Sequence, residues 1–578
     1  MNELRTVLEA FVFPSKHLPN CFNNNNLVNE LDSIYSEYGS VESLLEDCFI
    51  IENNTIKTFD GYTDKIMGIK KGVEPLHFNI SKPNGANRTM SIVNPVVLIP
   101  LHFYINKYNE EILKEQFKDE ENYSSSSRFH YDEGNFIRYV DYDGNPIEET
   151  YANVSQSTYQ ESLLNKQKIC DGKYYHMSID ISNFFNSIYT HIISWDLVDE
   201  KNKRLFDNFD ILNRTLNGNE TKGITIGPYT SSLFSEIILS KVDRAILDDC
   251  KKNNVNFTRF CDDYDFYSDS KDKLENDVRL TISESLSKYK LDLNMNKMKL
   301  EEFPFISLNT IQNKSVFLLM KRIEENDYGD NKLEFIEDIM NEINNSLKIK
   351  YSNCNYLLKF IISKIKKGII TKDYFDLDTA EILLDFLINM SFKYNMICSE
   401  CFNLISEIFN LIDVDRERII LKWIVKRNSR KSHIKEIIDI WLSYLIIKYN
   451  VYNNDVDCFM LEIMNKSCVC SILSLEYFLN NNLLKKYKDN IKELLNNIKI
   501  NLENRFGNDW KKASYFSKYW LLFYTNSIRW KIDRIDGFKD TILKDINLDN
   551  IIKDKELSKK YNLFKVMKDK NVEFFSFE

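Results

Sequence analysis

Hydrophobic and polar residues change their spacing along this chain of 578 residues. In the first half, short β-prone runs alternate with amphipathic stretches, and turn residues separate them. From about residue 330 onward, apolar residues recur at helical spacing, as in 335–347, 382–387, 405–412 and 437–445. The pattern predicts an α+β first half and an all-α second half whose paired helices stack as a HEAT-like solenoid.

Residues 259–267 predict two short strands joined by a tight turn, with Asp262 and Asp263 at its tip. Neighbouring carboxylates repel one another, and a hard divalent ion such as Mg²⁺ or Mn²⁺ would stabilise both in the charged form. Taken alone, this stretch also fits a solvated Asp-Asp turn.

A third carboxylate, Asp180, ends a predicted buried strand, and a turn into a helix follows it. Residues 223–228 predict a glycine-bounded loop that leads into a helix, where Pro228 suits the helix start because its missing N–H would have no partner. Two strand-end carboxylate sites are what a two-metal phosphoryl-transfer centre requires, with one ion activating the attacking oxygen and the other holding the triphosphate.

An earlier segment predicts a hairpin turn at 83–85 between β-prone runs. Lys82 and Arg88 would then stand near one another on the paired strands. In an enzyme that handles triphosphates they would form a phosphate clamp, and otherwise they are surface cations of an exposed hairpin.

In this order the motifs resemble those of reverse transcriptases. Residues 260–263 resemble the Y/F-x-D-D box, 180–185 the first palm motif, 223–228 the second, 291–299 the motif that follows, and 82–88 the fingers hairpin. The closest resemblance is to abortive-infection reverse transcriptases of bacterial anti-phage defence, above all the AbiK type. It implies right-hand fingers and palm over residues 1–310 and a helical-repeat domain over 311–578 in place of the thumb.

The resemblance also implies roles for individual residues. Asp180, Asp262 and Asp263 would bind the metal ions, together with Ile181 beside Asp180, and Lys297 would protonate the leaving pyrophosphate or stabilise its charge. The residues that would bind the nucleotide substrate are Lys82, Arg88, Ile181, Phe185 and Gly227. Among them, the ring of Phe185 would exclude a ribose 2′-hydroxyl.

Relatives of the AbiK type make DNA without a template and begin it on a protein hydroxyl. Ile226 stands before Gly227, where the family usually has glutamine, and this is consistent with weak template control. The context of Tyr38 matches the priming tyrosine best, with Tyr35 as second choice. The implied partners are dNTPs, a single-stranded DNA product attached to the protein, a possible RNA and further copies of the chain.

Composition sets the cellular context. The net charge of −10 does not suit a protein that grips long duplex nucleic acid, although a local basic channel is compatible with it. The 11 cysteines are scattered, which favours buried thiols in a reducing cytoplasm, and the resemblance implies that this cytoplasm is bacterial. We expect neither a secretory signal nor a membrane span.

Two alternatives remain open from the sequence. One is a conventional RNA-templated reverse transcriptase with a bound non-coding RNA. The other is a helical HEPN-type ribonuclease with a vestigial palm, because Arg427 and His433 have a spacing found in such enzymes. These two residues lie in a basic patch, 426–433, which we interpret instead as a solvated inter-helix loop or a contact with nascent DNA.

Overall fold

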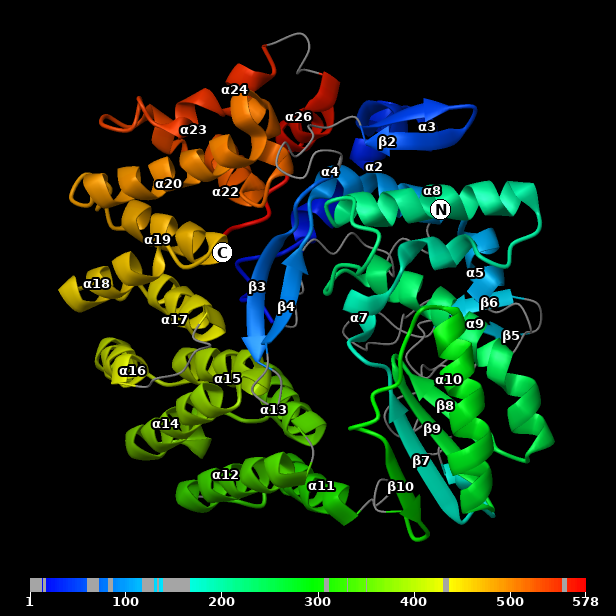
Figure 1. Ribbon diagram of the computed structural model, residues 1–578. Helices are drawn as coiled ribbons and strands as arrows, with labels where there is room; N and C mark the ends of the chain where they lie inside the picture. Colours follow the sequence, from blue (N-terminus) through cyan, green and yellow to red (C-terminus); the bar gives the residue numbers. More distant parts are fainter. Residues whose placement is uncertain are drawn as a thin grey trace.

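The computed structural model describes residue 13 and residues 17–59, 72–81, 87–116, 129–132, 135–138, 167–305, 311–329, 331–349, 351–429, 436–553 and 559–577. Figure 1 shows a mixed part, coloured blue to green, beside a helical part, coloured green to red. The hairpin of β3 (Leu76–Ser81) and β4 (Asn87–Ile92) lies between them. The predicted change from mixed to helical structure is therefore present.

The chain begins with two helices and two small hairpins. The elements are α2 (Asn25–Tyr38), α3 (Val41–Cys48), β1 (Phe49–Glu52), β2 (Thr55–Phe59), then β3 and β4, α4 (Pro95–Lys107), α5 (Asn109–Gln116), β5 (Phe129–Asp132) and β6 (Asn135–Arg138). Gly39 ends α2 with a left-handed φ of 70°, which glycine adopts without steric strain. The turn that carries Lys82 lies outside the described residues.

A four-stranded antiparallel sheet forms the centre of the mixed part. Its order is β10 (Lys299–Glu302), β7 (Tyr175–Asp180), β9 (Asp263–Ser268) and β8 (Asn256–Phe260). Between β7 and β8 lie α7 (Phe184–Ser187), η1 (Thr190–Ser194), α8 (Glu200–Leu216) and α9 (Tyr229–Lys252), and η2 (Lys273–Val278) and α10 (Arg279–Lys288) follow β9.

Alternation along β9 separates the two faces of this sheet. Tyr264 and Phe266 are fully buried, and α9 and η2 pack against β8 and β9. Asp263 and Asp265 alternate with them and therefore belong to the opposite face. The carboxylates of Asp263 and Asp265 therefore lie on the face of the sheet opposite to Tyr264 and Phe266.

From Ile311 onward the named elements of the described chain are helices. They are α11 (Ile311–Glu324), α12 (Lys332–Ile349), α13 (Tyr351–Lys366), η4 (Lys372–Tyr374), α14 (Leu377–Lys393), η5 (Asn395–Ile397), α15 (Cys398–Leu411), α16 (Arg416–Ser429), α17 (Glu436–Lys448), α18 (Asn454–Ile463), α19 (Cys468–Asn480), α20 (Lys488–Phe506), η6 (Gly507–Asp509), α21 (Trp510–Ala513), η7 (Ser514–Phe516), α22 (Trp520–Thr525), η8 (Asn526–Trp530), η9 (Ile532–Arg534), α23 (Ile542–Asp545), α24 (Leu548–Ile551) and α26 (Asn562–Asp569). Helices near in sequence pack together, as α13 and α14 do with α15. Their reading as a HEAT-like repeat, and the boundary at residue 310, stay predictions.

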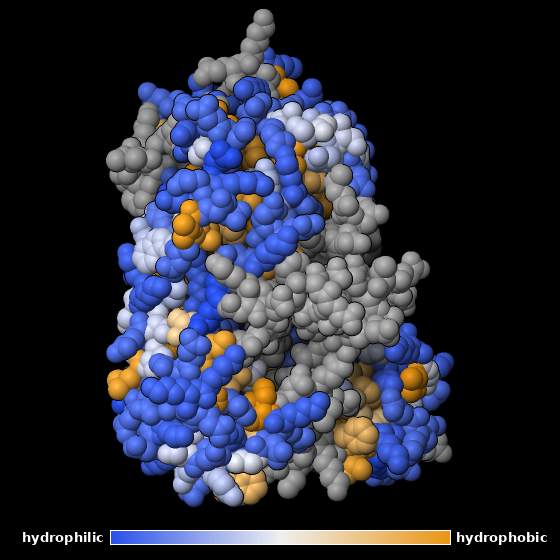
Figure 2. All heavy atoms as spheres, turned by 90° about the vertical axis from the view of Figure 1, so that its right-hand side faces the viewer, coloured by the Kyte–Doolittle hydropathy of each residue, from blue (hydrophilic) through white to orange (hydrophobic). Residues whose placement is uncertain are grey.

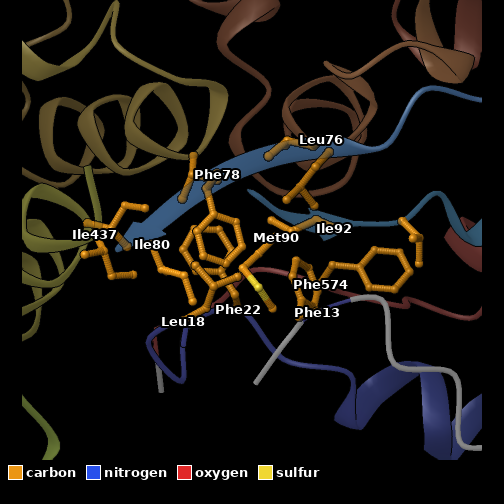
Figure 3. Close-up of a cluster of buried hydrophobic side chains, with 14 of the residues drawn as sticks. Phe13, Leu18, Phe22, Leu76, Phe78, Ile80, Met90, Ile92, Ile437 and Phe574 are labelled. Carbon is orange, nitrogen blue, oxygen red and sulfur yellow. The ribbon is translucent and has the colours of Figure 1, made fainter. Parts of the chain in front are cut away.

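The two parts share one hydrophobic core around the β3–β4 hairpin. Figure 3 shows side chains from both strands meeting Phe13 and Phe22 near the start of the chain, Ile437 of α17 and Phe574 near its end. Phe22 and Phe575 form a β-bridge, and their rings lie 4.9 Å apart. The beginning and the end of the described chain are therefore packed together beneath the hairpin.

Within the described residues, no helix is long and apolar enough to cross a membrane. The face seen in Figure 2 is mostly hydrophilic where it is coloured, and its hydrophobic residues form small separate groups.

Candidate active site

The three predicted aspartates meet at one end of the central sheet. In the antiparallel pairing of β7 with β9, Asp180 is the partner of Asp263. Directly opposite residues project from the same face of a sheet, so these two carboxylates are neighbours. Asp262 lies in the turn between β8 and β9, and its carbonyl accepts a hydrogen bond from the Ile181 N–H at 3.2 Å. Residues far apart in sequence thus converge, as the motif order predicted.

Burial and neighbouring negative charge raise the pKa values of Asp262 and Asp263. The pKa of Asp263 rises to about 6, first through partial loss of solvent and then through the negative charges of Asp262 and Asp180. Burial also raises the pKa of Asp262, and the charge of Asp180 adds to it. A cation placed among them would reverse this effect, because it favours the ionised form of each group.

Asp180 is held by the segment that follows α10. The Asn294 side chain donates to its Oδ1 at 3.1 Å, and the Lys297 ammonium donates to Oδ2 at 2.7 Å. The Asn294 N–H also donates to the Asp180 carbonyl at 2.8 Å. The predicted partner of pyrophosphate, Lys297, therefore lies directly at the carboxylate cluster.

The donor chemistry of the cluster fits a hard divalent cation. Asp180, Asp262 and Asp263 offer carboxylate oxygens, which are the ligands that Mg²⁺ and Mn²⁺ prefer. In the described part of the chain, however, no three or more carboxylate, imidazole or thiol side chains are already arranged as a metal site. The binding of Mg²⁺ or Mn²⁺ here, with Ile181 as a neighbour, stays a prediction.

The predicted substrate residues are joined by backbone contacts around the glycine loop. The N–H of Ile224 donates to the Phe185 carbonyl at 2.9 Å, and the Ile226 carbonyl accepts from the Ser91 N–H of β4 at 2.8 Å. Gly227 has a φ of 136°, a conformation that a residue with a Cβ rarely adopts. Arg88 is exposed on β4, which the same loop contacts through Ser91.

The sequence reasoning missed a buried ion-pair network directly behind the Asp262 turn. Arg259 of β8 is 1% exposed and binds Glu236 and Asp243 of α9. Tyr264 donates its hydroxyl to Asp243 at 2.8 Å. The available signal was a pair of acids spaced seven residues apart in a largely apolar helix.

A second missed contact lies farther along the carboxylate-bearing face. The ring of His176 in β7 makes contacts of 2.8 Å with Asp265 of β9 and of 3.3 Å with Glu301 of β10. The ring also stacks on Tyr267, with centroids 4.7 Å apart. This buried histidine links three strands of the sheet and so helps to hold the end of β7 in place.

The predicted priming tyrosines lie elsewhere. The Tyr38 hydroxyl accepts from Asn562 of α26 at 3.2 Å, and Tyr35 stacks on Phe103 with centroids 4.8 Å apart. Figure 1 shows α2 in the upper part of the molecule and β7 and β9 in the lower right. Burial raises the pKa of the Tyr38 phenol, and the nearby Cys48 and Asp47 raise it further.

The interpretation of Arg427 as part of a solvated loop is wrong. Arg427 lies on α16, is 2% exposed, and donates to Asp439 of α17 twice at 2.8 Å. It also donates to Glu462 of α18 at 2.8 Å. His433 lies outside the described residues. Arg427 thus fastens three helices together, which removes the main support for a nuclease site.

Residues 136–356 match the family model described as "Reverse transcriptase (RNA-dependent DNA polymerase)". The chain contains a reverse transcriptase domain. The match includes the sheet that carries Asp180, Asp262 and Asp263, and it ends inside α13. The β3–β4 hairpin precedes it.

A retron Ec83 reverse transcriptase from Escherichia coli is 30% identical over 120 residues. These residues make up 20% of this chain and 38% of that protein, so the similarity spans well under half of the relative. The comparison supports the reverse transcriptase domain, whereas the closer resemblance to the AbiK type stays a prediction.

Among solved structures, the chain is similar to telomerase from Candida albicans in complex with a fragment of telomeric RNA. The identity is 11%, the TM-score 0.26, and the coverage 71% of this chain and 70% of that one. Apo telomerase from Candida tropicalis is 13% identical with a TM-score of 0.28, and the match covers 72% of this chain and 73% of that one. Likenesses with scores this low carry no argument.

Proposed function

We propose that this protein is a nucleotidyltransferase of the reverse transcriptase type that adds deoxynucleotides to a hydroxyl and releases pyrophosphate. The observation that carries the proposal is the pairing of Asp180 with Asp263 across β7 and β9, with Asp262 in the adjacent turn. This is the arrangement of carboxylates that two divalent ions need in order to stabilise both the attacking and the leaving oxygen.

Different residues of the chain would bind the metal ions, the leaving pyrophosphate and the nucleotide. Asp180, Asp262 and Asp263 would hold Mg²⁺ or Mn²⁺, which supplies charge stabilisation for phosphoryl transfer when bound. Lys297, whose ammonium lies 2.7 Å from Asp180, would neutralise or protonate the leaving pyrophosphate. Phe185 and Gly227 would shape the pocket for the deoxyribose, and Arg88, with Lys82, would bind the triphosphate.

The test is incorporation of labelled dNTPs by the purified full chain in the presence of Mg²⁺. We expect the wild type to incorporate label and Asp262→Asn to lose at least about 100-fold of that rate. The matched control is Asp269→Asn, an exposed acid just beyond the end of β9. Equal rates for wild type and Asp262→Asn would contradict the proposal.

The finer proposal is untemplated synthesis that begins on Tyr38 and serves phage defence. It is supported by the motif resemblance and by Ile226 in place of the usual glutamine. Label that remains on the protein in a denaturing gel, without added nucleic acid, would support it. Tyr38→Phe should remove this label and Tyr35→Phe should retain it. Retention in Tyr38→Phe would exclude Tyr38 as the primer.

A defence role predicts that cells carrying the wild-type protein restrict phage growth and that cells carrying Asp262→Asn do not. Equal plating on both strains, with equal protein levels, would show that polymerisation is not what protects the cell.

A second candidate is RNA-templated synthesis, which the similarity to a retron reverse transcriptase favours. The two candidates differ in their product. A templated enzyme yields a defined complementary DNA that is lost after treatment with ribonuclease, whereas an untemplated enzyme yields DNA of unconstrained sequence that survives the treatment. Sequencing the product made by the protein as purified, before and after treatment, separates them.

A further inference from the structure

Arg259 lies behind the turn that carries Asp262, and its guanidinium uses all five of its N–H donors. Nε donates to both oxygens of Asp243 at 3.1 Å, and Nη2 donates to Asp243 at 2.8 Å and to Glu236 at 3.1 Å. Nη1 donates to Glu236 at 3.3 Å and to the carbonyl of Cys261 at 3.1 Å. One buried cation thus binds a helix and the peptide unit just before Asp262.

That peptide unit follows a strained residue. Cys261 has a φ of 54°, in the left-handed region that residues with a Cβ seldom occupy. The next carbonyl, that of Asp262, accepts from the Ile181 N–H at 3.2 Å. The two successive carbonyls of the turn are therefore fixed from different sides, one by Arg259 and one by the residue after Asp180.

The same guanidinium connects the turn to the glycine loop. Glu236 and Asp243 stand seven residues apart on α9, and therefore on one side of that helix. The helix begins at Tyr229, two residues after Gly227. Arg259 and Tyr264 are register partners on β8 and β9, and the Tyr264 hydroxyl donates to the same Asp243. Arg259 therefore connects the glycine loop, through α9, to the Asp262 turn. The loop would face the nucleotide, and the turn would face the metal ions.

We propose that Arg259 is a positioning residue for the reaction: it holds the Cys261–Asp262 turn in its left-handed conformation against α9, and thereby sets the place of the Asp262 carboxylate relative to Asp180. This inference rests on the proposed function. Lysine cannot replace the guanidinium fully, because its three N–H donors lie on one nitrogen, whereas the guanidinium directs five donors from three nitrogens at Glu236, Asp243 and the Cys261 carbonyl.

The test pairs Arg259→Lys with two substitutions at the strained residue. Arg259→Lys keeps the charge for Glu236 and Asp243 but loses the hydrogen bond to the Cys261 carbonyl, and kcat for dNTP incorporation should fall about 10- to 100-fold. Glycine adopts the left-handed conformation without strain, so Cys261→Gly in the same chain should restore most of that loss. Cys261→Ala removes the thiol but keeps the Cβ, and it should restore nothing.

Each double variant is compared with its own Cys261 single variant, and thermal unfolding is measured for all of them. A lower Tm with unchanged kcat in Arg259→Lys would overturn the inference, because the network would then serve stability alone. Equal recovery with glycine and alanine would also overturn it. If Arg259→Lys does not fold, Glu236→Gln, which loosens the same guanidinium, takes its place with the same expected pattern of recovery.

Asp262→Asn separates this inference from the proposed function. If Asp262→Asn retains incorporation, the proposed function itself is wrong. If Asp262→Asn abolishes incorporation while Arg259→Lys leaves kcat unchanged, only the positioning role is refuted.

Discussion

Asp180 and Asp263 are direct partners across two antiparallel strands, and each adds negative charge to the surroundings of the other. Folding therefore brings together groups that repel one another and whose ionised forms the unfolded chain keeps apart. The arrangement that the proposed function needs therefore lowers the stability of the fold. This effect can be measured as a change in Tm with pH.

The pH dependence of stability should carry the signature of Asp263. Its pKa rises from an ordinary 3.8 to about 6 on folding, so between these values the folded state binds more protons than the unfolded state. Stability should therefore fall as the pH rises through this window. Asp263→Asn removes both the partly buried charge and its repulsion by Asp262 and Asp180, and in a chelating buffer its Tm should exceed that of the wild type by about 1–3 °C at pH 7.5.

At pH 4 the difference in Tm should be much smaller, because Asp263 is then protonated in the folded state and, near its ordinary pKa of 3.8, partly protonated in the unfolded state. Asp171→Asn, an exposed acid before β7, is the control and should follow the wild type at both pH values. A Tm difference for Asp263→Asn that does not change with pH would contradict this explanation.

The hairpin that carries Arg88 is fastened to the helical part, and loosening it should weaken nucleotide binding. The N–H and the side-chain amide of Asn79 both donate to Glu436 of α17, at 3.1 and 3.3 Å. Glu436→Ala should raise KM for dNTPs about 3- to 10-fold while kcat changes less than about twofold. Steady-state kinetics check this, with the exposed Glu337→Ala of α12 as control. A fall in kcat at unchanged KM would argue against a clamp role for the hairpin.

The ring of Phe185 should decide between deoxyribose and ribose. It is half-buried on α7, and its backbone carbonyl ties it to the glycine loop. Phe185→Ala should raise the ratio of kcat/KM for ribonucleotides to that for deoxynucleotides about 10- to 100-fold. Both kcat/KM values are measured with the same preparation, so the fraction of active protein cancels in their ratio. An unchanged ratio would remove Phe185 from the substrate site.

The packing of the two chain ends should make the last residues essential for stability. Phe575 is 2% exposed and packs on Phe22, and the Ser576 N–H donates to the Cys21 carbonyl at 3.0 Å. Phe575→Ala should lower the free energy of unfolding by about 3–5 kcal/mol in urea titrations. Phe317→Ala, where the ring is 61% exposed, should change it by less than about 0.5 kcal/mol. Equal effects would mean that the ends do not share the core.

The strands and the three aspartates could be predicted because their signals are local. A β-prone run that ends in Asp180, and two acids between aromatic residues at a turn, specify strand ends whatever surrounds them. The positions of Arg259 and Arg427 could not be predicted in this way. Both are buried cations whose partners lie in other elements, whereas arginine is mostly an exposed residue in folded proteins.

The other contacts that the sequence does not predict join residues far apart in the chain. Nothing near Phe575 indicates that it meets Phe22, because the contact depends on how the helical part folds back onto the hairpin. The motif around Tyr38 is equally local and says nothing of its distance from the carboxylates. The structure places its hydroxyl against Asn562, near the other end of the chain.

The central claim is that Asp180, Asp262 and Asp263 form one centre for nucleotidyl transfer. The most direct measurement is the single-turnover rate of labelled dNTP incorporation with saturating Mg²⁺ for wild type, Asp180→Asn and the control Asp171→Asn. Loss of at least about 100-fold in Asp180→Asn alone is the predicted result. Incorporation by Asp180→Asn at the wild-type rate would contradict the account.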